Sequence, residues 1–206
     1  MRELPMFPLG SVLFPHMVLP LHVFEPRYRA LVQKVLDGDR QFGVVLISRG
    51  HEVGGGDVRT DVGTIAQVIR AEPLDEERWF VIAVGTRRIR VEGWLPDDPY
   101  PRAEVTELDE APAESGVDEL LAGIGPRLRR VLALQAELGQ DNAPVTFEFD
   151  DDPAVAAWQA AILSPLTPFD AQQVLVAGDP VARLELVRDL LGDAEELLQL
   201  QLQQGT

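Results

Sequence analysis

The sequence predicts an α+β protein in two parts: a β subdomain with one helix over residues 1–110, and an α-helical bundle over residues 117–206. Three observations lead to this division. Short apolar runs bounded by proline and glycine fill the first half, as in the strands of a barrel or sandwich. Apolar residues spaced three and four apart dominate the second half, which is typical of amphipathic helices. Between them, residues 111–116 (APAESG) have the small and polar composition of a linker.

Seven short segments of the first half have strand character. Residues 4–7 and 18–24 are bounded by prolines and suit edge or bulged strands, because a proline cannot donate to a central ladder. The run FGVVLIS at 42–48 is rich in β-branched residues and suits a buried strand. The other predicted strands are residues 62–71, 79–85, 88–94 and 100–108.

One helix is predicted to interrupt these strands, beginning in the stretch FEPRY at 24–28. Pro26 suits the first helical position, because its fixed φ fits a helix and its missing N–H would have no partner there. We expect Glu25 to be attracted to the open amides of the first turn. Gly38 should end the helix. Its apolar face is Tyr28, Leu31, Val32, Val35 and Leu36.

Four helical segments are predicted in the second half. The first covers residues 117–138, with a kink or break expected at Gly125 and Pro126. The next follows the acidic residues 150–152, which should cap it, and a short helix lies in TPFDAQQVLV (167–176). The last opens with Asp179 as N-cap and runs over roughly 20 residues, with Gly192 as a weak point.

The formal charge of −16 disfavours two classes of partner. Residues 1–110 carry 13 basic and 18 acidic side chains, and residues 111–206 carry 5 and 16. Such a field repels phosphate backbones and anionic lipid at long range, so we expect no membrane partner and consider nucleic acid unlikely. Prolines break the apolar N-terminal run, which excludes a signal peptide, and no apolar stretch approaches the roughly 20 residues that span a bilayer. With no cysteine in the chain, a cytoplasmic location is expected.

We find no catalytic constellation, and we expect no cofactor and no metal. The chain has neither a G-x-x-x-x-G-K-[ST] nor a G-x-S-x-G motif, and its one lysine, Lys34, lies between the apolar positions of its helix. Glycines 54–56 precede a strand rather than a helix, which favours a hairpin tip over a nucleotide site. The three histidines do not share metal-binding spacing.

The only dense basic run is GTRRIR at 85–90. Arg88 and Arg90 alternate with Ile89 and should share one strand face. A surface for nucleic acid would add stacking aromatics, and only Trp94 is near in sequence. Ion pairing with Glu92 or Glu104 is therefore the favoured interpretation.

The candidate partner-binding residues are Phe14, His16, Met17 and Leu19, which flank a proline-bounded loop. Apolar residues beside such a loop are either core or an adaptable binding surface. The sequence leaves both interpretations open.

An ordered series of motifs resembles a known family. The series is ELPMFPLGSVLFPHMVLPLHVFEPRYRALV, FGVVLI, VGTIAQV, VGTRRIRV and PY at 99–100. It resembles the LON substrate-binding domain, the N-terminal domain of ATP-dependent Lon proteases, and PLTPFDAQQVLVAGDPVARLELVRDLL resembles the helical part of the same domain. The resemblance implies a PUA-like β-barrel followed by a helical bundle. One departure is Ile89, where the basic strand of the family usually carries an aromatic residue.

The resemblance implies binding of unfolded or partner polypeptides without catalysis, because the chain carries neither the ATPase nor the peptidase motifs of a full Lon protease. We expect exposed apolar side chains to make the contact, and an unpaired strand edge could add main-chain hydrogen bonds. An RNA-binding PUA-like protein is the alternative, and a hydrolase with an unrecognised site is a third possibility.

Overall fold

The computed structural model describes residues 1–49, 58–75, 77–112, 116–140 and 146–204. The chain divides into two compact units, Met1–Asp109 (unit 1) and Glu110–Thr206 (unit 2). The predicted hairpin tip at 54–56, together with His51, lies outside the described residues, as do residues 113–115 of the predicted linker.

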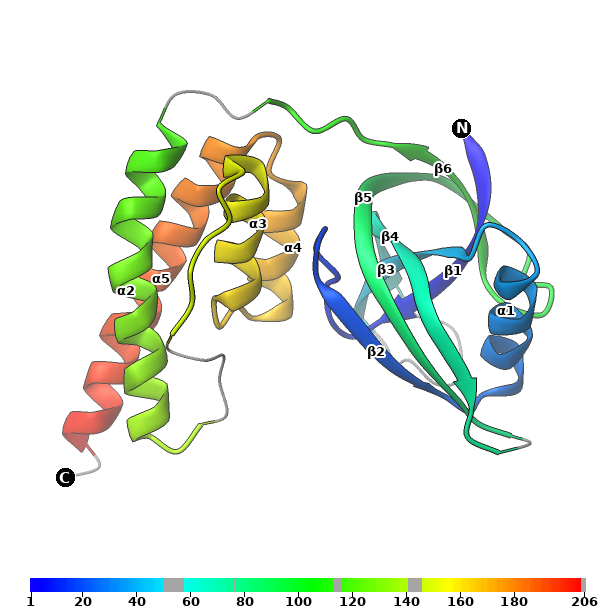
Figure 1. The fold of residues 1–206 in the computed structure, drawn as a ribbon, viewed down its shortest axis with the longest axis horizontal. Helices are drawn as coiled ribbons and strands as arrows, with labels where there is room; N and C mark the ends of the chain where they lie inside the picture. Colours follow the sequence, from blue (N-terminus) through cyan, green and yellow to red (C-terminus); the bar gives the residue numbers. More distant parts are fainter. Residues whose placement is uncertain (50–57, 76, 113–115, 141–145, 205–206) are drawn as a thin grey trace. The chain divides into compact units, whose positions relative to one another are not determined.

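Unit 1 is a closed ring of paired strands with one helix beside it (Figure 1). The sheet order is β2-β5-β4-β3-β1-β6, and β5 also pairs with β6. The β5–β6 pairing closes a ring of five strands and leaves β2 attached to β5 alone among the described residues. The α+β class is confirmed. The elements of unit 1 are β1 (Arg2–Leu9), β2 (Val18–Val23), α1 (Pro26–Leu36), β3 (Gln41–Arg49), β4 (Val58–Pro73), β5 (Trp79–Leu95) and β6 (Arg102–Glu107).

The two strands predicted at 79–85 and 88–94 are wrong as separate elements, because they are halves of the single strand β5. The first half of β5 pairs with β2, and the second half pairs with β6. Register shifts in the β4–β5 pair between Thr64 and Ala66 and between Val68 and Arg70 accompany this change of partner. Such irregularities bend a strand, which lets one long strand contribute to two sides of a ring.

Two apolar clusters hold unit 1 together. One includes Met6, Ile65 and Ile89, and it packs closely on Gly43, where an added Cβ would require the end of the Met6 side chain to shift. The other joins α1 to the strands, with the rings of Phe7 and Tyr28 stacked at 4.0 Å. A stacked aromatic pair of this kind adds about 1 kcal/mol to its burial, so the helix is fixed to β1.

Helix α1 begins at Pro26 and ends just before Gly38, as predicted. Glu25 is the N-cap residue of α1 and its side chain makes no cap hydrogen bond; its attraction to the amides of the first turn stays a prediction. Its carboxylate accepts a hydrogen bond from Arg27 Nε at 3.0 Å.

Unit 2 consists of four helices in its described part: α2 (Val117–Glu137), α3 (Pro153–Leu163), α4 (Pro168–Val176) and α5 (Pro180–Gln204). Helices α2 and α5 run side by side (Figure 1). The capping predictions are confirmed: Asp152 accepts from Ala154 N, and Asp179 accepts from Ala182 N, each at 2.9 Å.

The break predicted as one possibility at Gly125 and Pro126 is wrong, since α2 continues through both residues, while the kink predicted as the other stays a prediction. Pro126 lies on the exposed side of the helix, while Gly125 is buried. A carbonyl left without its N–H partner on an exposed side can bond to water, so packing of the buried side keeps the helix continuous.

Candidate functional site

The loop between β1 and β2 is held by main-chain hydrogen bonds to the middle of β5. His16 N donates to Gly85 O at 2.8 Å, and Gly85 N donates to Met17 O at 2.9 Å. The Thr64 hydroxyl donates to Leu13 O at 2.6 Å. A Cβ at Gly85 would overlap the carbonyl oxygen of Phe14, so the loop can lie this close only because position 85 is glycine.

This anchoring divides the four predicted partner-binding residues. Phe14 is only 4% exposed, and Met17 and Leu19 are partly buried against the core cluster that contains α1. His16 is exposed, at the turn of the loop, with φ 66°. One of the four side chains is therefore fully presented to solvent, and a binding role for the set stays a prediction.

A larger apolar surface lies on the outer side of β2 and β5. Residues directly opposite each other in an antiparallel pair share one face of the sheet. Three such cross-strand pairs, whose β2 members are exposed and whose β5 members are half-buried, form this surface, which we call the β2–β5 face. They are Val18 with Val84, Pro20 with Ile82, and His22 with Phe80.

At one end of the β2–β5 face, His22 also lines a small hollow at the start of α1. Val18 is 57% exposed, and Phe24, just beyond β2, is 59% exposed. The rings of His22 and Phe80 lie 5.1 Å apart. The hollow holds about 100 Å³ and is lined in part by His22, Phe24 and Tyr28. Apolar side chains exposed together in this way indicate a contact surface.

The free edge of β2 is poorly suited to adding a further strand. Pro20 lies in the middle of β2, and a proline in an edge strand stands with its missing N–H toward solvent. An added strand would lose that donor, which is a common protection against edge pairing. Side chains therefore favour contact here more than the main-chain ladder that the sequence suggested.

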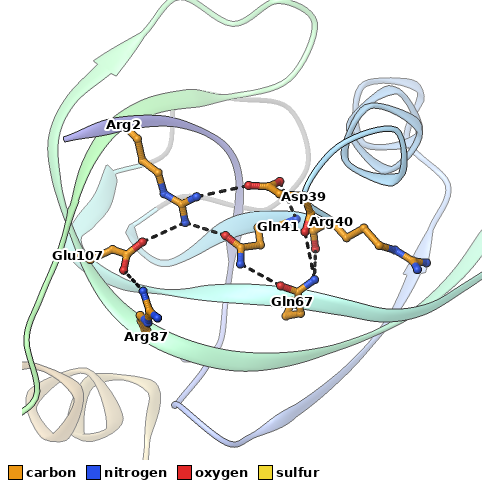
Figure 2. A network of polar contacts seen from close by, with 7 residues as sticks. All are labelled: Arg2, Asp39, Arg40, Gln41, Gln67, Arg87 and Glu107. Carbon is orange, nitrogen blue, oxygen red and sulfur yellow. Dashed lines mark hydrogen bonds and ion pairs between the residues drawn. The ribbon is translucent and has the colours of Figure 1, made fainter.

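A polar network joins side chains of β1, β3, β4, β5 and β6 in unit 1 (Figure 2). Arg2 lies between Asp39 at 3.4 Å and Glu107 at 3.2 Å, and Arg87 donates to the other oxygen of Glu107. Gln41 accepts from Arg2 at 2.7 Å and donates to Gln67 at 2.9 Å. The hydrogen bond from Arg87, with the charges of Arg87 and Arg2, lowers the pKa of Glu107 below its ordinary value, against the raising effect of burial.

These contacts bear on the basic run of β5. Arg87 is paired with Glu107, an acid other than the two expected from the sequence, and Arg88 is only 3% exposed. Of the three arginines of the run, Arg88 is buried and Arg87 is held by Glu107, so only Arg90 is both exposed and outside the ion pairs found among the described residues, and one such cation is not the cluster that phosphate contacts require. The RNA-binding alternative receives no support from the described residues.

Membrane-spanning helices and metal-binding clusters are both absent from the described part of the chain. No helix there is long and apolar enough to cross a bilayer. No group of three or more histidine or acidic side chains is arranged to hold a metal ion.

Sequence reasoning missed the outward residues Phe80, Ile82 and Val84. The run WFVIAVG is apolar at nearly every position, and such a run predicts a strand buried on both faces. Its exposed face becomes evident only when β2, at the edge of the sheet, is seen as its neighbour.

Solved structures similar to this chain define the class of fold. The Lon N-terminal domain protein of Xanthomonas campestris superposes with a TM-score of 0.66 and 28% identity, covering 90% of this chain and 96% of that one. The N-terminal domain of the Mycobacterium avium complex Lon protease superposes with a TM-score of 0.68 over 93% and 99% of the two chains, and at 20% identity it shows the fold alone. The fold is that of a Lon N-terminal domain.

Sequence comparison then gives the family. The model of the ATP-dependent protease La (LON) substrate-binding domain matches residues 3–193, and the chain belongs to that family. Lon protease 2 of Sorangium cellulosum and the Lon protease of Trichlorobacter lovleyi are each 30% identical to it, over 96% and 97% of the chain. The chain spans about a quarter of the length of these curated relatives.

Proposed function

We propose that this protein binds unfolded or partner polypeptides, without chemistry of its own, through the β2–β5 face of unit 1. Membership of the LON substrate-binding domain family supports binding of protein substrates. The observation that carries the proposal is the outward apolar face of Val18, Pro20, Ile82 and Val84, beside the hollow at His22.

The chemistry of this face suits an extended apolar segment. Each outward residue of β2 stands beside a half-buried apolar residue of β5, so alternate side chains of a bound segment would meet apolar surface at every step. Because Pro20 removes one main-chain donor, contact depends more on side chains than on a regular ladder. Side-chain contact of this kind tolerates many sequences, as a receptor for unfolded segments must.

The charge of the chain supports the same class of partner. At −16, the protein repels polyanions and attracts basic polypeptides at long range. We propose a cytoplasmic location, where unfolded clients and reduced thiols coexist; the chain has no cysteine to oxidise.

The test measures binding of a fluorescent, permanently unfolded, carboxymethylated protein to the full chain by anisotropy. Val18→Asp, alone and with Ile82→Asp, places charge on the β2–β5 face and should weaken binding by about tenfold or more, since each change removes apolar contact and adds a desolvated carboxylate.

Val58→Asp is the matched control. Val58 is 54% exposed and begins β4, outside the β2–β5 face. It should bind the unfolded protein as the unaltered chain does. Equal binding by all variants would show that the β2–β5 face is not the site, and no binding by the unaltered chain would remove the proposed function itself.

A further inference from the structure

Where α2 and α5 pack together in unit 2, along a line of contact that we call the seam, a carboxylate of α5 binds guanidinium groups of α2. Beside the second half of α2, Arg127 Nε lies 3.3 Å and Arg130 Nη1 3.0 Å from the carboxylate of Glu195 on α5. This part of the seam is closed by arginines of the chain itself.

Beside the first half of α2, the seam is open. It forms a hollow of about 400 Å³, which we call the α2–α5 groove. Two of its positions are glycines, Gly116 and Gly123, and a Cβ added to either would meet open space. The groove is lined by Gly116, the N-cap residue of α2, by Glu119, Leu120 and Gly123 of α2, and by Val181, Glu185 and Arg188 of α5.

The charges of the groove are unbalanced. Glu119 comes from α2 and Glu185 from α5, both are exposed, and no salt bridge joins either to a cation in the part of the chain that the structure describes. The one cation that lines the groove, Arg188, donates from Nε to Asp189 at 2.9 Å. Arg188 is also attracted by Glu185 on the same helix, but it forms a salt bridge with neither Glu119 nor Glu185, whereas Glu195 further along the seam binds two guanidinium groups.

We propose that the α2–α5 groove binds an arginine or lysine side chain of a partner polypeptide. The aliphatic stem would lie on Leu120 and Val181, which are half-buried, and the cation would lie between Glu119 and Glu185. The partner is therefore a polypeptide with a basic residue flanked by apolar ones. This inference goes beyond the proposed function, because the groove is on the other compact unit and recognises charge.

The test uses the full chain and a fluorescent peptide of alternating leucine and arginine, with the same peptide carrying citrulline in place of arginine for comparison. Binding is followed by anisotropy at low and at physiological salt. The pair Glu119→Gln with Glu185→Gln should weaken binding of the arginine peptide about tenfold, the scale of a charge-assisted contact. The citrulline peptide should bind the unaltered chain as weakly as the arginine peptide binds this variant.

A second variant leaves the charge unchanged. Glu119 lies in the first turn of α2, where a carboxylate also stabilises the helix, so its loss alone could act through folding. Gly123→Leu fills the groove at a position with open space and raises helix propensity. We expect it to weaken binding of the arginine peptide to a similar extent, with an unchanged circular dichroism spectrum.

The matched control is Glu137→Gln with Asp193→Asn, which removes the same charge from exposed positions of the same helices outside the groove. It should change binding less than twofold. An equal loss in the control pair, or full binding by Gly123→Leu, would overturn the proposal. In Val18→Asp, the arginine peptide should still bind more tightly than the citrulline peptide, and this difference separates the groove from the β2–β5 face, which contacts the leucines that both peptides share.

Discussion

Arg183 carries a charge into the interior of unit 2. Its side chain is 0% exposed, its guanidinium lies 3.3 Å from the ring centroid of Trp158, and Nη2 donates to Glu110 at 3.2 Å. Arginine is rarely buried unless it is paired in this way, and its flat guanidinium suits stacking on an aromatic ring. Lysine could not replace it, because an ammonium group offers no flat surface to the indole.

In unit 1, the carboxylate of Glu107 joins Arg2 of β1 to Arg87 of β5 (Figure 2). Its side chain is about a third exposed, so solvent weakens these ion pairs. Its pKa in the folded state is nevertheless lowered from 4.5, first by the hydrogen bond from Arg87.

The lowered pKa of Glu107 predicts a stability that depends on pH. A carboxyl group whose pKa is lower in the folded state stabilises the fold above its unfolded pKa, here 4.5, and this contribution is lost as the pH falls through the folded value. At neutral pH, Glu107→Gln should lower the free energy of unfolding by about 0.5 kcal/mol, the scale of partly exposed pairs.

Urea denaturation of the Glu107→Gln variant and the unaltered chain across the acid range tests this expectation. The difference in unfolding free energy should shrink toward zero in acid. Glu104→Gln, at an exposed position on the same strand, should leave the unfolding free energy unchanged both at neutral pH and in acid. A Glu107→Gln difference that stayed constant with pH would assign the effect to packing instead.

Among the elements, β5 does most to arrange unit 1. Over its 17 residues it pairs with β2, β4 and β6. Gly85, near its middle, also bonds to the loop that leads into β2. The position of the β2–β5 face therefore depends on a glycine that is not part of the face.

Gly85→Ala should destabilise unit 1 by about 2–3 kcal/mol, because the added Cβ would overlap the carbonyl oxygen of Phe14 and the backbone would have to move. Denaturant unfolding measures the loss. Gly93→Ala is the control on the same strand, since its Cβ would meet open space, and it should change the unfolding free energy by less than about 0.5 kcal/mol. Similar values for the two variants would show that the loop is not held at Gly85.

Helix α2 illustrates the limit of local rules. Gly125 and Pro126 are poor helix formers, yet the helix passes through both. Leu128, Val131 and Leu132 beyond them are buried, and the apolar surface that they remove from water outweighs one lost hydrogen bond. Propensity alone could not predict this outcome.

At the scale of the molecule, the chain forms two compact units with different charge. Unit 1, Met1–Asp109, is a ring of strands, and unit 2, Glu110–Thr206, is a set of helices. Each has its own buried residues, such as Ile65 in the first and Trp158 in the second. Most of the net negative charge lies in the helical half, which suits the α2–α5 groove to basic partners.

We therefore predict that residues 1–109 and 110–206 fold when expressed separately. Each fragment should unfold cooperatively, and the sum of their circular dichroism spectra should match that of the whole chain. The helical fragment should also bind the arginine peptide. Loss of cooperative unfolding in either fragment would show that the units depend on each other for stability.

The sequence alone determined the family, the two-part organisation of strands followed by helices, and the ends of several elements. These properties depend on neighbouring residues: Pro26 can begin a helix, and Asp152 and Asp179 can cap one, whatever lies across the fold. The motif series of the first half identified the family because it is local and ordered.

Only the tertiary structure decided which apolar side chains are exposed and which charges are paired. Phe14 and Val18 are close in sequence and similar in character, but one is buried and the other exposed, because β2 lies at the edge of the sheet. Arg127 is paired and Glu119 is not, because of what α5 brings opposite each of them. Exposure and pairing depend on residues that are distant in the sequence. For that reason, neither the β2–β5 face nor the α2–α5 groove was evident before the strands and helices were placed side by side.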